Sequence, residues 1–305
     1  LLEQNEFNLY TIAHEIENRH PDMPLHARLG DVCDEPGVRA LFNQYKPNIV
    51  FHAAAYKHVP SLQGQIREAV RNNAIGTEVM ARVSDEDKCE KFVLISTDKA
   101  VNPTSIMGAT KRMAEILVQA RNAQSEVAFV TVRFGNVLGS AGSVVPLFEK
   151  QIEEGGPVTV THPDVTRFFM TIPEACQLIM QACVIGQGSE IFVLDMGPPV
   201  NIDFLARQYI RMAGLVPGRD IEIVYTGLRP GEKLVEELFH DEEKFGKTVH
   251  HQINLVESRI LDRGAVMATT NLLVSKCKNY DAAGIEQIMK ELVPEYTPKN
   301  NGVDL

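Results

Sequence analysis

The stretch "STDKAVNPTSIMGATK" at residues 96–111 carries the side chains best suited to chemistry. Asp98 and Lys99 form an acid–amine pair directly after an apolar run, and such groups can donate and accept protons when they are positioned next to a substrate. Met107 lies four residues before Lys111, so both share one face if the segment is helical. Because a methionine cannot transfer a proton, the sequence predicts that Asp98 and Lys99 do the acid–base work.

The elements around this stretch predict where it lies. Near-continuous apolar runs at 47–55, 90–97 and 127–137 are typical of parallel strands covered on both faces. They alternate with helical apolar spacing at 61–88 and 107–122, and residues 25–32 and 34–45 add a further strand and helix. The pattern predicts an α/β fold with a doubly wound parallel sheet.

In such a sheet, ligands bind at the carboxyl ends of the strands. Thr97 ends one strand, and the cap signal Thr104-Ser105 opens the following helix. An isolated Asp-Lys dipeptide after a strand is usually a solvated loop. Its position beside a helix that carries Lys111 favours a shared active-site crevice instead.

The chain is expected to divide near residue 137. Beyond it, Gly and Pro interrupt shorter strands, which predicts a dinucleotide-binding domain over 1–137 and a mainly substrate-binding lobe over 138–305. The run "EIFVLDM" (190–196) indicates that late strands of the sheet are interleaved with this lobe. From about residue 261 we expect a strand and a closing amphipathic helix.

Composition restricts the function classes. The 305 residues have a formal charge of −10, which argues against nonspecific nucleic-acid or anionic-membrane binding. Five cysteines form no CxxC pair and no histidine has ligand spacing, so we expect no metal site and a reducing, cytoplasmic location. No apolar run approaches the roughly 18 residues of a membrane helix.

Several motifs in order carry a family resemblance. "STDKAVNPTSIMGATKR" resembles the capsule-type nucleotide-sugar 4,6-dehydratases of the extended short-chain dehydrogenase/reductase superfamily. The segments "FHAAAYKHVP", "NNAIGT", "VRFGNVLGSAGSVVPLF", "TRFFMTIPEA" and "LRPGEKLVEEL" agree, so the resemblance spans roughly residues 1 to 295. A tyrosine often stands where this chain has Met107, and methionine there resembles the branch that acts on UDP-N-acetylglucosamine without inverting C5.

The resemblance implies a Rossmann-like lyase that uses NAD catalytically and makes a UDP-4-keto-6-deoxy sugar for surface polysaccharide or glycan synthesis. NAD would take hydride from C4 and return it to C6. Lys99 would remove the C5 proton and a protonated Asp98 would donate to the departing C6 hydroxyl, with burial favouring both neutral forms. Lys111 would hold the nicotinamide ribose, and Thr97 would orient O4.

The cofactor residues implied by the resemblance lie in the first 111 residues: Glu3, Asp31, Val32, Ala53, Ala54, Ala55, Asn73 and Lys111. Glu3 would accept hydrogen bonds from the adenosine ribose, which favours NAD over NADP, or it is a plain helix N-terminal acid. Asp31 contacts adenine or simply ends its strand, and Asn73 bonds cofactor or strand backbone. No GxGxxG loop is present, so we expect the N-terminal βα unit, and any tether to the inner membrane, outside this sequence.

The substrate residues implied by the resemblance lie mainly in the second lobe: Asn136, Val145, Pro146, Arg167, Arg229 and Glu232. A guanidinium matches phosphate oxygens and a carboxylate accepts from ribose hydroxyls, which suits Arg229 and Glu232 to a UDP-sugar. The alternative is that "RPGE" is only a turn that begins a helix.

Three functions remain open from the sequence. Besides the dehydratase, the fold suits a C5-inverting dehydratase or a C4 epimerase of a UDP-sugar, and a non-catalytic nucleotide-sugar or dinucleotide-binding module. We expect a UDP-sugar partner, no nucleic acid, no membrane contact from these residues, and a homo-oligomer.

Overall fold

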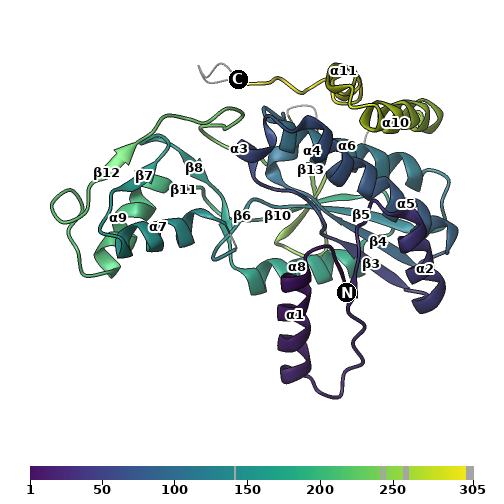
Figure 1. Ribbon diagram of the computed structural model, residues 1–305, viewed down its shortest axis with the longest axis horizontal. Coiled ribbons are helices and arrows are strands. Elements are labelled where there is room, and N and C mark those ends of the chain that lie inside the picture. Colours follow the sequence, from purple (N-terminus) through teal and green to yellow (C-terminus); the bar gives the residue numbers. More distant parts are fainter. Residues whose placement is uncertain (141, 241–242, 244, 257–260, 300–305) are drawn as a thin grey trace.

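A six-stranded sheet forms the centre of the computed structural model, which describes residues 1–140, 142–240, 243, 245–256 and 261–299 (Figure 1). Its order is β13-β14-β10-β5-β4-β3. The four parallel strands are β3 (Ile49–His52), β4 (Lys91–Ile95), β5 (Ala128–Arg133) and β10 (Ile191–Leu194). The antiparallel strands β14 (Ile253–Val256) and β13 (Phe245–Lys247) complete the β10 edge.

Helices cover both faces of this sheet, as the near-continuous apolar runs predict. On β4, Phe92 and Leu94 join the core under α2 (Glu35–Tyr45), α5 (Gly76–Glu86) and α6 (Ile106–Asn122). Val93 points to the other face, into the core with α8 (Ile172–Ile185). Because neighbouring side chains alternate between two cores, no face of β4 is left to water. The expected doubly wound α/β fold is confirmed.

The segment expected as one helical region at 61–88 is built from several pieces. It comprises α3 (Val59–Leu62), α4 (Ile66–Val70), a π-helical turn η1 (Arg71–Ile75) and α5. The fully buried Asn73 lies in the π-helical turn.

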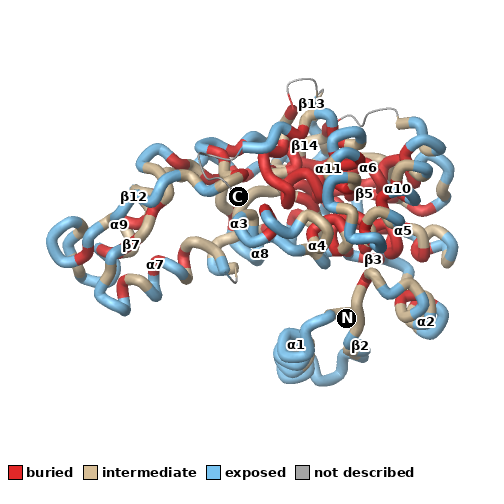
Figure 2. Tube along the Cα trace, turned by 45° about the horizontal axis from the view of Figure 1, so that its top comes forward, coloured by how far each residue is buried: buried red, intermediate tan, exposed pale blue. Residues whose placement is uncertain are grey.

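The first two strands stand apart from the main sheet. β1 (Leu2–Glu3) and β2 (Arg28–Leu29) pair only as a separate two-stranded parallel sheet. A groove of about 700 Å³, lined by residues such as Leu2, Val50 and Phe51, lies between this pair and β3. The intervening helix α1 (Glu6–Arg19) buries none of its residues (Figure 2). The strand expected at 25–32 therefore forms, but no described strand connects it to the six-stranded sheet.

The second lobe has its own small core and lies beside the sheet (Figure 1). α7 (Val144–Glu153) and α9 (Ile202–Met212) pack against the paired strands β7 (Val158–Val160) and β12 (Ile223–Tyr225). Two short pairs connect the lobe to the sheet: β6 (Asn136–Val137) with β9 (Phe169–Met170), and β8 (Thr166–Arg167) with β11 (Val200–Asn201). Since β10, β13 and β14 belong to the main sheet, the two parts are interleaved in sequence.

The C-terminal part differs from expectation. The strand expected after residue 261 is a helix, α10 (Arg263–Lys278), followed by α11 (Ala282–Leu292). The Val- and Thr-rich composition favours a strand, but Val266, Leu273 and Cys277 lie at helical spacing and are buried against α6 and α4. Tertiary burial of that face outweighs local β propensity.

A buried ion cluster fixes α6 to the sheet directly behind residues 96–99. Glu115 on α6 is fully buried and accepts from Arg133 (Nη2 to Oε2, 2.8 Å) and from Arg112 (Nη1 to Oε2, 2.9 Å). Ser96 Oγ donates to Glu115 Oε1 at 2.6 Å. Burial raises the pKa of Glu115, but the two guanidinium groups outweigh burial and hold the pKa at about 2.

Removing Glu115 should therefore destabilise the protein strongly. Glu115→Ala leaves two buried guanidinium groups without their acceptor, and we expect the free energy of unfolding in urea to fall by about 3–5 kcal/mol. The matched control is Glu286→Ala, which breaks the exposed Lys290–Glu286 pair and should cost less than about 1 kcal/mol.

The same cluster makes the free energy of unfolding depend on pH. The folded pKa of Glu115 is depressed, so its contribution is present above the ordinary value of 4.5 and is lost as the pH falls towards 2. Equal losses of stability in the two variants, with no difference in acid sensitivity, would contradict this role for the cluster.

Candidate functional site

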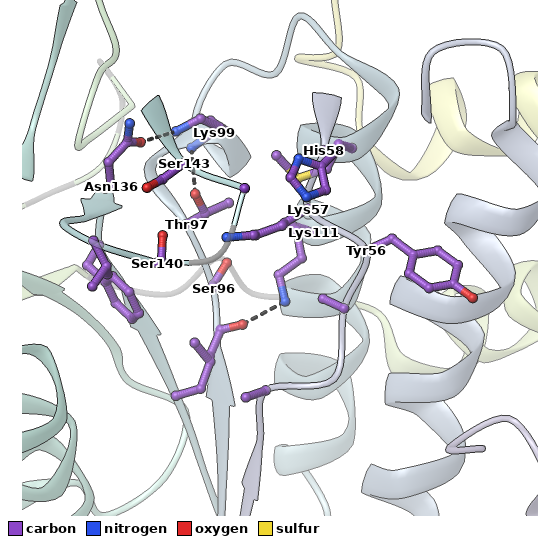
Figure 3. Close-up of a pocket in the computed structure, with 18 residues that line it drawn as sticks. Tyr56, Lys57, His58, Ser96, Thr97, Lys99, Lys111, Asn136, Ser140 and Ser143 are labelled. Carbon is purple, nitrogen blue, oxygen red and sulfur yellow. Dashed lines mark hydrogen bonds between the residues drawn. The ribbon is translucent and has the colours of Figure 1, made fainter. Parts of the chain in front are cut away.

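Three adjoining cavities follow the carboxyl edge of the parallel strands. The central cavity, of about 360 Å³, is lined by Thr97, Lys99, Met107, Lys111 and Asn136 among others (Figure 3). A cavity of about 510 Å³ on the side of β1 shares Ala53 and Ala55 with it. A cavity of about 470 Å³ in the second lobe shares Asn136, Gly142 and Ser143 with it. An elongated ligand pair can thus lie along one path with its reacting atoms at the centre.

Asp98 is the fully buried anion beside the central cavity. Thr97 caps a short 3-10 turn, η2 (Asp98–Ala100), so the chain turns back directly after β4. Asp98 Oδ1 accepts from Lys99 Nζ at 2.9 Å and from Thr97 Oγ1 at 2.9 Å. Its Oδ2 has no hydrogen-bond partner among the described residues. Gly135 makes this packing possible, because a Cβ at that position would lie 2.9 Å from Oδ2.

Lys99 bridges the turn after β4 and strand β6, which leads into the second lobe. Besides its bond to Asp98, its ammonium donates to Asn136 Oδ1 at 3.1 Å (Figure 3). Burial acts to lower the pKa of Lys99, but the charges of Asp98 and Glu236 and the hydrogen bond to Asp98 outweigh it, so the pKa lies above its ordinary value. Burial thus favours the neutral amine, as expected, but the neighbouring charges outweigh burial. While Asp98 is ionised, Lys99 keeps its proton.

Helix α6 presents Met107 and Lys111 to the same cavity. Ser105 caps the helix by accepting from Gly108 N at 3.1 Å, and a Cβ at Gly108 would overlap the Lys99 carbonyl oxygen. Lys111 Nζ donates to the Ile95 carbonyl at 2.6 Å. Burial lowers the pKa of Lys111 to about 8, with the charge of Glu115 opposing the shift. This amine is thus fixed at the strand end and only weakly basic.

On the β1 side, the residues expected to hold a cofactor separate into two groups. Those that line the cavity are Glu3, Val32, Ala53, Ala54 and Ala55. Asp31 and Asn73 do not line it.

Asp31 and Asn73 instead hold protein groups. The Asp31 carboxylate accepts from Arg71 Nη2 at 2.8 Å and from Cys33 N at 2.8 Å. The Asn73 side chain accepts from Tyr56 N at 2.7 Å and donates to Tyr56 O at 3.0 Å. Of the roles left open, this geometry favours backbone bonding for Asn73, which secures the loop that follows Ala55.

On the side of the second lobe, most expected substrate residues meet in one cavity. Asn136, Pro146, Arg167, Arg229 and Glu232 line it, whereas Val145 is buried in α7 and does not. Arg167 Nη2 donates to Glu232 Oε1 at 2.7 Å, and Glu232 Oε2 accepts from Arg229 N at 3.1 Å. The turn at 229–232 is thus held by its own carboxylate and faces the cavity.

Two charged residues near the site were missed by sequence reasoning. Lys57 lines the central cavity and has no hydrogen-bond or ion-pair partner within the described ranges, and burial lowers its pKa. The sequence contains a sign of its location, because Lys57 is a cation in the loop that follows a predicted parallel strand. Glu236 is buried behind the cavity, 3.9 Å from Arg167 Nε. Its signal was weak, because it follows the expected turn in a run that also contains exposed residues.

The described residues contain neither a membrane-spanning helix nor a cluster of metal ligands. None of their helices has the length and apolarity to cross a membrane. Within those residues, no group of three or more His, Cys, Asp and Glu side chains is arranged to hold a metal ion.

Comparison with known proteins identifies relatives of the chain. A model of the polysaccharide biosynthesis protein family matches residues 1–258. The capsular polysaccharide biosynthesis protein CapD of Staphylococcus aureus is 50% identical over 258 residues, which is 83% of this chain and 42% of that protein. A UDP-glucose 4-epimerase of Rickettsia bellii is 37% identical over 197 residues, or 64% of this chain and 56% of the epimerase. The chain thus spans less than half the length of its capsular relative.

Solved structures agree on the fold. Pen from Bacillus thuringiensis superposes with a TM-score of 0.77 at 33% identity, over 85% of this chain and 79% of Pen. The dTDP-glucose 4,6-dehydratase DesIV from Streptomyces venezuelae, solved with NAD, has a TM-score of 0.64 at 17% identity, over 78% of this chain and 87% of DesIV, and shares the fold. With its family model matched from residue 1 to residue 258, the chain belongs to the polysaccharide biosynthesis protein family.

Proposed function

We propose that the chain forms the catalytic core of a lyase that removes water from the 4,6 positions of UDP-N-acetylglucosamine, with NAD as cofactor. The observation that carries the proposal is the buried Asp98–Lys99 pair, bonded to Thr97. Thr97 and Lys99 line the central one of three adjoining cavities, and Asp98 lies directly behind them. A proton donor and a proton acceptor side by side are what loss of water across a C5–C6 bond requires.

The cavity on the β1 side fits part of a dinucleotide. Its small alanines allow close approach of a ligand, and Glu3 and Lys111 lie where ribose hydroxyls would need an acceptor and a donor. The ammonium of Lys57, which has no partner among the described residues and lines the central cavity with Lys111, suits a diphosphate. NAD bound there would accept hydride from C4 and supply it to C6.

Thr97 and Asp98 would handle the proton of the C4 hydroxyl. Thr97 Oγ1 already donates to Asp98, so it can take the O4 proton and pass its own to the Asp98 carboxylate. The ionised state of Asp98 beside the Lys99 ammonium is then the correct starting state. This relay would take the part of the tyrosine that often stands at the place of Met107 in similar enzymes.

The proton gained by Asp98 would then leave with the C6 hydroxyl. Lys99, once neutral, removes the proton from C5, which is acidified by the C4 ketone, while Asp98 protonates the departing hydroxyl to give water. The C5 proton returns from Lys99 when hydride reaches C6. The water that leaves carries the proton that Asp98 received, and the cycle ends with Asp98 ionised again.

The nucleotide would occupy the cavity of the second lobe. Arg229 provides a guanidinium for the diphosphate, and Glu232, held by Arg167, provides an acceptor for the uridine ribose. Asn136 lies between the two cavities and would mark the position of the sugar.

A C4 epimerase is the second candidate, favoured by the similarity to the Rickettsia UDP-glucose 4-epimerase. An epimerase moves hydrogen only at C4 and O4, so it needs no acid at C6 and no base at C5. The two candidates therefore differ in their dependence on Lys99.

Replacing either member of the pair should abolish dehydration. We expect Asp98→Asn and Lys99→Met each to lower kcat for 6-deoxy product from UDP-N-acetylglucosamine by about 10²–10⁴-fold, because each loses one proton-transfer group. Asp281→Asn, at an exposed helix cap outside the cavities, is the control and should behave like the unmodified protein. Turnover by Lys99→Met at the normal rate would exclude the dehydratase scheme.

Nucleotide binding can be tested separately from catalysis. Arg229→Ala should weaken the affinity for UDP by about 10–100-fold, since a charge-assisted hydrogen bond contributes about 1.5–3 kcal/mol. Arg219→Ala removes an exposed arginine of the same lobe and serves as the control. Calorimetric titration with UDP measures both, and equal affinities for the two variants would contradict the assignment of the second-lobe cavity to the nucleotide.

A further inference from the structure

The acid–base scheme leaves one proton without a destination. Lys99 begins as an ammonium paired with ionised Asp98. Passing the O4 proton to Asp98 removes the negative charge that holds the proton on Lys99, and burial then favours the neutral amine. Lys99 must still give its proton to some acceptor before it can take one from C5. Its two hydrogen-bond partners, Asp98 and Asn136, cannot serve once Asp98 is protonated.

Glu236 is a buried carboxyl group that could accept this proton. Its side chain is 4% exposed, its Oε1 lies 3.9 Å from Arg167 Nε, and its Oε2 has no hydrogen-bond partner among the described residues. A buried carboxylate oxygen without a donor is costly, and it is relieved by a proton. The geometry thus leaves a buried acceptor unsatisfied beside Arg167, which lines the second-lobe cavity.

The charges around Glu236 connect it to the pair. Burial is the largest influence and raises the pKa of Glu236. The Lys99, Arg167 and Lys233 cations act in the opposite direction, and the Asp98 anion adds to the increase. In return, the Glu236 charge is among those that raise the pKa of Lys99. The two groups therefore compete for protons.

We propose that Glu236 accepts the proton of Lys99 during the cycle and so converts Lys99 into the base that acts at C5. One N–H bond of the Lys99 ammonium breaks and one O–H bond forms on Glu236, directly after a small side-chain movement or through one water. Lys99 becomes neutral and Glu236 becomes a neutral acid. No charge is created, since an ammonium and a carboxylate are both removed.

The proton returns at the end of the cycle. After Lys99 has given its C5-derived proton back to carbon, the neutral amine recovers a proton from Glu236, and the starting ion pair with Asp98 re-forms. Glu236 touches no substrate in this scheme. It acts only through Lys99, whose protonation state it controls, so it is a positioning residue and not a catalytic residue. The inference rests on the proposed dehydratase function.

The test is the pH dependence of dehydration in Glu236→Gln. Glutamine keeps the shape but accepts no proton, so Lys99 must release its proton to bulk water. We expect kcat at neutral pH to fall about 10²-fold and to recover tenfold per pH unit as the pH rises. Glu236→Asp keeps an acceptor and should restore most of the activity. The matched control is Glu237→Gln, which changes the neighbouring but exposed carboxylate and should retain the normal pH profile.

A second readout separates this role from simple packing. Substrate deuterated at C5 should give a larger isotope effect on kcat in Glu236→Gln, because C5 deprotonation becomes slower, while the affinity for UDP should stay unchanged. A pH profile and isotope effect equal to those of the unmodified protein, or an equal loss at every pH in both the Gln and Asp variants, would overturn the proposal. Failure of the proposed function is distinguishable, since the unmodified protein would then form no 6-deoxy product.

Discussion

The rest of the site depends on the contact between Asp98 and Lys99. A fully buried carboxylate is tolerated only when donors satisfy it, and Asp98 has two on the same oxygen, the Lys99 ammonium and the Thr97 hydroxyl. The same contact keeps Lys99 charged despite its burial. A change in the protonation of Asp98 therefore changes the basicity of Lys99, and in the proposed reaction this would couple proton transfer at O4 to proton transfer at C5.

The fold holds this pair in place from several directions. Gly135 and Gly108 allow the next strand end and helix α6 to approach the turn, where a side chain would collide with Asp98 or with the Lys99 backbone. Behind the turn, Ser96 is bonded to the Glu115–Arg133 cluster, so the strand end cannot shift without breaking buried ion pairs. In front, Asn136 ties Lys99 to the second lobe. A rigid turn between two lobes is suited to a reaction that needs donor and acceptor at fixed positions.

The sequence predicted the parallel strands and the helix with Met107 and Lys111 because apolar periodicity and cap residues report directly on local structure. Many of the residues named from the sequence line the cavities, but Asp31, Asn73 and Val145 do not. The sequence did not predict the helix at 263–278, whose stability comes from burial against α4 and α6. Nor could it reveal the buried Glu236, or decide between the two roles left open for Asp31 and for Asn73, because the contacts that decide them join residues separated in the chain.

The chemical structure of the product tests the central claim, loss of water from the 4,6 positions, most directly. The reaction with UDP-N-acetylglucosamine is run in deuterated water and the product is examined by NMR. If Asp98 and Lys99 remove water as proposed, the product carries a methyl group at C6 and a ketone at C4, with the configuration at C5 unchanged. A product that keeps its C6 hydroxyl and differs only at C4 would contradict the account.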